Sequence, residues 1–214
     1  MNKQKDEQKE IVYVYIEKYQ GFDKIQFNFC EKVQFYIEFI DQKHIVLKKA
    51  IHERIFPYDF WGKNISDVSL LIGDNGSGKT TVMRALCQWV CLFSEDHFPS
   101  EKGIIVFRCG DDMEYVAFSN GQPMEIDAGI PNLLFTMSKE GRTISDFFKD
   151  ISLIYYTNTM TELNLPDCDI LLDYSMPQRI KQANSDGKMI WKDVLLNYKK
   201  NEFNKQMELM IEKN

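Results

Sequence analysis

The residues of this chain that are best suited to chemistry lie in one glycine-rich stretch, Leu71–Thr81 (LIGDNGSGKTT). Gly73, Gly78, Lys79 and Thr80 occupy the fixed positions of the pattern GxxxxGK followed by Ser or Thr. Glycines in such a stretch leave space for successive backbone N–H groups to turn toward phosphate oxygens. The spacing therefore predicts a loop that binds the phosphates of a nucleoside triphosphate.

The polar side chains of this stretch have distinct expected roles. Lys79 reaches the β and γ phosphates and is the expected catalytic residue, the Thr80 hydroxyl binds Mg²⁺, and Thr81 contacts a phosphate nearby. A helix that begins near Lys79 adds unpaired N–H groups and the positive end of its dipole. No guanine-reading NKxD segment is visible, so the expected ligands are ATP and Mg²⁺. The predicted nucleotide-binding residues are Gly73, Asn75, Gly76, Ser77, Gly78, Lys79, Thr80 and Thr81.

Two flanking elements are expected to position this loop. Asp67–Ile72 (DVSLLI) is typical of a short, largely buried strand, and Thr80–Phe93 has the apolar spacing of a helix packed against a sheet. The competing interpretation is a glycine-rich turn that carries a surface lysine. The matching strand and helix favour the phosphate loop.

Further strands are expected on both sides of the loop. A β meander precedes it, with alternation that places Ile25, Phe27 and Phe29 on one face. Antiparallel strands follow it, with a hairpin turn at Asn120–Gly121, and Ile151–Tyr156 is expected to be a buried strand of the main sheet. The remaining expected strands are Ile11–Ile16, Lys24–Phe29, Val33–Ile40, Ile45–Lys49, Gly103–Arg108, Glu114–Phe118 and Pro123–Ile126.

The domain prediction has three parts. Residues 1–10 form a polar tail, and residues 11–175 form an ATP-binding lobe with the β meander at 11–50 and the loop at 73–81. Residues 186–214 form a helical segment, one long helix or two. Its apolar stripe reaches the last residue without a glycine or proline, so we expect a helix that is cut off or made for a partner.

Composition and charge narrow the class of protein. The formal net charge of -6 gives no support to a surface that coats nucleic acid. Five scattered cysteines lack the spacing of a zinc site or of a secreted disulfide framework, and the polar start of the chain is no signal peptide. No apolar run approaches the length of a membrane span. These features predict a cytoplasmic protein.

The segment NGSGKTT, together with YIEKYQGFDKIQFNF ahead of it, resembles the N-terminal half of ABC-type P-loop ATPases of the SMC, RecF and OLD groups, which include bacterial AAA-type ATP-binding proteins. The resemblance covers about residues 11–175. It implies an α/β fold, a P-loop NTPase core with an N-terminal antiparallel β meander and a C-terminal helical segment. An Asn-aromatic-basic element of these proteins aligns with Lys18, Tyr19 and Gln20, where both polar positions differ.

The resemblance also implies partners and missing parts. The family pairs two half-sites around ATP, so a homodimer or a partner chain is expected to complete the site, and DNA is a partner by resemblance only. The signature motif, the strand ending in Asp-Glu and the switch histidine are not found in this chain. Asp173, at the end of Asp169–Asp173 (DILLD), comes nearest to the acidic strand. A strand-end carboxylate that solvates a turn is the favoured interpretation of Asp173, ahead of a metal ligand.

Three functions remain in competition. The first is an ABC-type ATPase lobe that hydrolyses ATP only when another chain or half supplies the missing motifs. The second is a nucleotide-sensing interaction module without hydrolysis. The third, a self-contained kinase or small phosphotransferase, is disfavoured by the β meander ahead of the loop and by the lack of a recognisable lid or acceptor base.

Overall fold

The structure is a computed structural model that describes residues 9–40, 44–53, 57, 60–62, 65, 68–149, 151–157 and 168–175. The chain divides into two compact units, Met1–Ile151 and Ser152–Asn214, and each is described by itself. The predicted C-terminal helical segment at 186–214 lies outside the described residues. The elements of the first unit are β1 (Lys9–Tyr19), β2 (Phe22–Asn28), β3 (Val33–Phe39), β4 (Ile45–Ile51), α1 (Lys79–Ser94), β5 (Gly103–Cys109), β6 (Asp112–Ser119), β7 (Gln122–Met124), β8 (Asp127–Ala128), α2 (Leu133–Glu140) and α3 (Ile144–Phe148).

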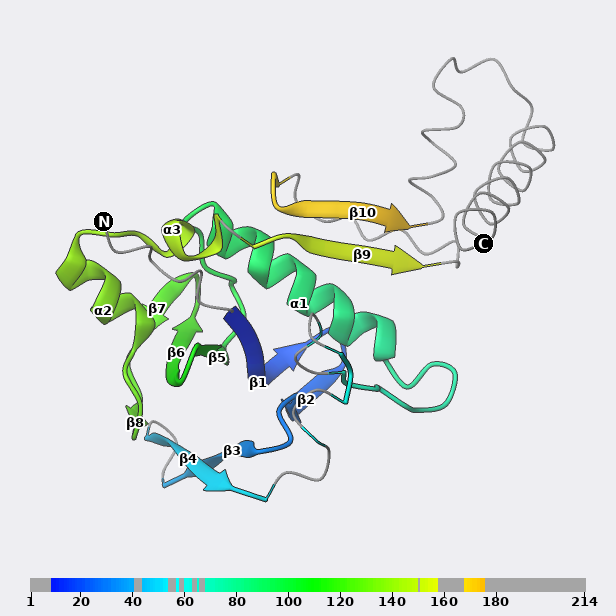
Figure 1. Cartoon of the computed structure of the whole chain (residues 1–214), viewed down its shortest axis with the longest axis horizontal. Coiled ribbons are helices and arrows are strands. Elements are labelled where there is room, and N and C mark those ends of the chain that lie inside the picture. Colours follow the sequence, from blue (N-terminus) through cyan, green and yellow to red (C-terminus); the bar gives the residue numbers. More distant parts are fainter. Residues whose placement is uncertain are drawn as a thin grey trace, which may run out of the picture. The chain divides into compact units, whose positions relative to one another are not determined.

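A five-stranded antiparallel sheet in the order β2-β1-β5-β6-β7 forms the centre of the first unit. Figure 1 shows β1, in dark blue, beside β5, in green, although the two strands are distant in the sequence. Val12–Ile16 in β1 is fully buried, as expected for a central strand covered on both faces. The predicted hairpin at Asn120–Gly121 is confirmed, and both residues have positive φ.

The predicted meander is wrong in its connectivity, although its four strands are confirmed. β2 is an edge strand of the large sheet, whereas β3 pairs with β4 in a separate three-stranded sheet, β3-β4-β8. Side chains of β2 connect the two sheets. The Asn28 side-chain amide donates to the Phe35 carbonyl oxygen (3.0 Å) and accepts from the Phe35 N–H (2.7 Å). The Gln26 Oε1 accepts from the Ile37 N–H (3.2 Å) and the Tyr13 hydroxyl (2.8 Å).

Helix α1 confirms the predicted apolar helix and packs on the large sheet. The Trp89 ring stands edge-on to Phe118 of β6, with 4.8 Å between ring centroids, and a Cβ on Gly103 would lie 2.6 Å from both rings. The end of α1 is connected to α3 through Asp96, whose carboxylate accepts from the Ser145 N–H (2.9 Å) and hydroxyl (2.7 Å). The sheet therefore fixes the direction of the helix whose first residues follow the glycine-rich loop.

The segment ahead of the loop contradicts the sequence prediction. Residues 68–72 form no regular secondary structure. Val68, Leu70 and Ile72 are exposed, the last two by 80% and 81%. A strand needs a neighbour to pair with its N–H and C=O groups. Within the described residues this apolar stretch has no such ladder, so the predicted buried strand at Asp67–Ile72 is wrong.

In the second unit, β9 (Leu153–Thr157) and β10 (Leu171–Ser175) form a two-stranded parallel sheet. The strand predicted at Ile151–Tyr156 is confirmed, but its placement as a buried strand of the main sheet is wrong. Ile154 and Tyr156 are both 63% exposed, and β9 pairs with β10 alone in the part of the chain that the structure describes.

The predicted α/β fold, a P-loop NTPase core, is wrong. The described residues are mostly antiparallel β structure with three helices, and a parallel ladder joins only β9 to β10 and the short β8 to β4. The physical reason is that most of the strands are joined by tight turns, which favour antiparallel neighbours, while the strand expected before the loop does not form. Among the described residues, no helix has the length and apolar composition that a membrane crossing requires.

We predict that Asn28→Ala lowers the free energy of unfolding by about 1–3 kcal/mol, because the N–H and C=O of the buried Phe35 both lose their partner. Urea denaturation measures the change. Gln34→Ala, an exposed position one residue away on β3, is the matched control and should change stability by less than about 0.5 kcal/mol. Equal losses in the two variants would contradict the bridging role of Asn28.

Candidate functional site

The glycine-rich loop leads directly into the first turn of α1. Gly78 is the N-cap of the helix and has a φ of 88°, a left-handed conformation that favours glycine. The first helical hydrogen bond runs from the Val82 N–H to the Gly78 carbonyl oxygen (3.0 Å), so the N–H groups of residues 79–81 precede it. No side chain caps this end and its first turn carries no acidic residue. The positive end of the helix is therefore open to an anion.

The Lys79 side chain forms hydrogen bonds with the backbone at the start of the loop. Its ammonium group donates to the carbonyl oxygens of Gly73 (2.6 Å) and Asp74 (2.7 Å), and lies 3.5 Å from the Ser77 hydroxyl. The Ser77 N–H donates to the Asp74 carbonyl oxygen (3.1 Å), which tightens the same turn. An ammonium group has three N–H donors, and the one that makes the long bond to Ser77 is the donor that a phosphate oxygen would most easily take over.

The eight predicted nucleotide-binding residues lie in the loop that precedes α1 and in the first turn of that helix. Gly78, Lys79 and Thr81 are partly buried, and Thr80 is exposed on the first turn of α1. Among the described residues, no group of three His, Cys, Asp or Glu side chains is placed to hold a metal ion. The Thr80 hydroxyl can serve as one ligand of a Mg²⁺ ion that takes its other ligands from phosphates and water. The other predicted residues, Gly73, Asn75, Gly76 and Ser77, are exposed.

The turn between β1 and β2 lies against this loop, a contact that the sequence did not reveal. Gln20 and Gly21 have φ angles of 44° and 95°, as a type I′ hairpin requires. The ring of Phe22, which follows the turn, points its end at Gly78, since a Cβ built on Gly78 would lie 2.1 Å from the Phe22 Cζ. In the sequence, Phe22 stands beside a Gly-containing turn, and nothing in its spacing relates it to a loop more than fifty residues later.

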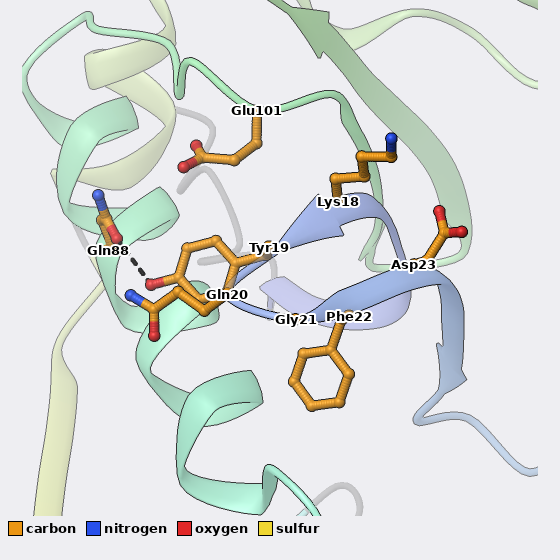
Figure 2. Close-up of a pocket in the computed structure, with 8 residues that line it drawn as sticks. All are labelled: Lys18, Tyr19, Gln20, Gly21, Phe22, Asp23, Gln88 and Glu101. Atoms are coloured by element: carbon orange, nitrogen blue, oxygen red, sulfur yellow. Dashed lines mark hydrogen bonds between the residues drawn. The ribbon is translucent and has the colours of Figure 1, made fainter.

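A polar hollow of ≈ 530 Å³ lies beside the same turn (Figure 2). The Tyr19 hydroxyl donates to the Gln88 Oε1 of α1 (3.0 Å) and so connects the hairpin to the helix. Burial raises the pKa of the Tyr19 phenol, the Glu101 carboxylate raises it further and Arg84 opposes the shift, so the hydroxyl keeps its proton. The hollow is lined by Lys18, Tyr19, Gln20, Gly21, Phe22, Asp23, Gln88 and Glu101.

The residues aligned with the Asn-aromatic-basic element therefore have different environments. Tyr19 is buried, while Lys18 and Gln20 are exposed at the hollow. The remaining candidate, Asp173, lies within β10 rather than at its end, because the strand continues to Ser175. It belongs to the second unit, which is described by itself.

Comparison of this chain with protein-family models, with curated proteins and with solved structures gives no match. The resemblance to ABC-type ATPases stays a prediction from the loop motif.

We predict that Gln20→Asn stabilises the hairpin beside the loop by about 0.5 kcal/mol, because Asn tolerates positive φ better and Asn-Gly is the preferred type I′ pair. The second hairpin of the same sheet offers a matched control, since its turn is already Asn120–Gly121. Asn120→Gln should lower stability by a similar amount. Thermal unfolding measures the change in melting temperature of both variants. Shifts in the same direction would contradict the assignment of Gln20–Gly21 as a type I′ turn.

Proposed function

We propose that this protein binds ATP with Mg²⁺ at the loop Gly73–Thr81. The observation that supports the proposal best is the position of Lys79, whose ammonium group lies against the carbonyl oxygens of Gly73 and Asp74, on the first residue of a helix with an uncapped N-terminus. A triphosphate bound there would receive the open N–H groups of the first turn, and the Lys79 donor that makes the long bond to Ser77 could turn to a phosphate oxygen. A purely structural turn does not need an open helix end.

Different residues of the loop would contact different parts of the triphosphate. Glycines 73, 76 and 78 keep the backbone free of side chains where it must approach the phosphates. Lys79 neutralises charge on the β and γ phosphates, and Thr80 and Thr81 offer hydroxyl groups on the first turn. Mg²⁺, when bound, supplies further neutralisation of the phosphate charge. In this scheme the chain's own residues bind and orient the nucleotide.

Hydrolysis is assigned to a completed assembly. The sequence lacks the signature motif and the acidic base that would activate water, so another chain would have to supply them. The purified chain alone is then expected to bind ATP and turn it over slowly or not at all. We propose that this activity is cytoplasmic, in keeping with scattered cysteines that lack the spacing of a disulfide framework.

Lys79→Ala is predicted to weaken Mg-ATP binding by about tenfold to a hundredfold, because charge-assisted hydrogen bonds to phosphate contribute about 1.5–3 kcal/mol. Isothermal titration calorimetry measures the change. Lys48→Ala on β4 removes a surface lysine that pairs with Glu38, and should leave the affinity for ATP unchanged. Unchanged ATP binding in Lys79→Ala would reject the proposed site.

The alternative function, a nucleotide sensor without hydrolysis, is favoured by one observation, the contact between the β1–β2 turn and Gly78. A bound triphosphate would alter the loop and, through Phe22, the exposed turn that lines the polar hollow. Hydrogen exchange of residues 18–23 with and without Mg-ATP tests this route. A sensor should show changed protection in the turn and no turnover with or without a partner chain, whereas turnover that appears when a partner chain is added would favour the ATPase assembly.

A further inference from the structure

We propose that Phe22 is a positioning residue for the phosphate loop, and that it sets affinity for the phosphates without contacting the nucleotide base. This inference rests on the proposed function and adds a residue that the motif does not contain. Phe22 belongs to β2, far from the loop in sequence, and the fold alone brings the two together.

The contact is directed at the backbone of Gly78. A Cβ built on Gly78 would lie 2.1 Å from the Phe22 Cζ, 2.9 Å from Cε1 and 3.0 Å from Cε2, so the ring points end-on at the glycine. Gly78 holds a left-handed conformation at the N-cap of α1. The ring therefore closes one side of the residue that joins the loop to the helix, and restricts how that peptide can move.

Phe22 is held by elements that do not depend on the loop. The type I′ turn fixes its backbone, β1 pairs with β2 on one side and with β5 on the other, and Tyr19 anchors the hairpin to Gln88 of α1. Figure 2 shows the Phe22 ring on the opposite side of the hairpin from Lys18 and Glu101. Phe22 is thus a lining residue of the hollow whose ring end is directed at Gly78.

The segment on the other side of the loop contributes no strand. Among the described residues, 68–72 form no regular secondary structure, and the Ser69 hydroxyl donates to the carbonyl oxygen of Phe29 (3.4 Å), which follows β2. The loop is consequently supported from its C-terminal side, by α1 and Phe22. Displacement of Gly78 would move the N–H groups of the first turn, and small displacements of binding groups carry large losses.

The sharpest test adds one atom at the contact. Phe22→Tyr places a hydroxyl on Cζ, the ring atom nearest Gly78, and should weaken both Mg-ATP and Mg-tripolyphosphate binding by the same factor, about tenfold. Phe27→Tyr adds the same hydroxyl to the same strand, away from Gly78, and should change neither affinity. Thermal unfolding verifies that each variant is folded. Loss of ATP binding alone would overturn the proposal in favour of base stacking, and unchanged affinities would overturn it outright.

A double-mutant cycle covers the case in which Phe22→Tyr does not fold. Gly78→Ala should weaken tripolyphosphate binding in both backgrounds, because a φ of 88° strains alanine, and should cost less in a Phe22→Ala background, where the ring no longer opposes the added methyl group. Equal costs in the two backgrounds would contradict the contact. Lys79→Ala distinguishes failure of the proposed phosphate site from failure of the proposed role of Phe22. Unchanged tripolyphosphate binding in Lys79→Ala would reject the phosphate site itself. Loss of binding in Lys79→Ala together with unchanged binding in the Phe22 variants would reject only the positioning role of Phe22.

Discussion

The contact between Trp89 of α1 and Phe118 of β6 is the interaction on which the position of the candidate site depends. It requires Gly103 between the two rings, because a Cβ there would overlap both. Phe93, one turn later, packs on Phe118 and Phe148, so the C-terminal half of α1 is fixed by an aromatic cluster. The N-terminal half of the helix projects from this anchor toward the β1–β2 turn. The aromatic cluster thus holds the C-terminal half of α1 on the sheet, and the loop precedes the other end of the same helix.

Local features of the fold could be predicted from the sequence, and its strand order could not. The turn at Asn120–Gly121 and the helix after the loop depend on neighbouring residues, and both are confirmed. The pairing of β1 with β5 depends on residues about ninety positions apart. The continuous burial of Val12–Ile16 shows in addition that both faces of this central strand are covered. Interpreted as a meander, the same residues were expected to pair only with strands next to them in sequence, and the amide bridge from Asn28 to Phe35 replaces the expected ladder.

The candidate site shows the same division between local and distant information. Motif spacing located the loop residues, since the pattern is contiguous and each position has its own chemical reason. It could not locate Phe22, because the contact with Gly78 is made by the fold. The sequence prediction that Leu70 and Ile72 are buried was also wrong. Apolar composition was taken as burial, but burial of a strand requires a neighbour, and in the described residues this stretch has none.

Lys79 has two roles, because residues 68–72 ahead of the loop form no strand that could hold it. Its ammonium group binds the Gly73 and Asp74 carbonyl oxygens and so connects the start of the loop to the start of α1, while its long bond to the Ser77 hydroxyl (3.5 Å) is the one that a phosphate oxygen could replace. An arginine would keep the charge but present a planar fork in place of three tetrahedral donors, so it could not make both sets of bonds in this geometry. The requirement for lysine thus follows from the shape of the loop as much as from the charge of the ligand. Phe22 contacts Gly78, the residue before Lys79, so the two ends of the loop are each held by a side chain, and phosphate would order a loop whose ends are already close.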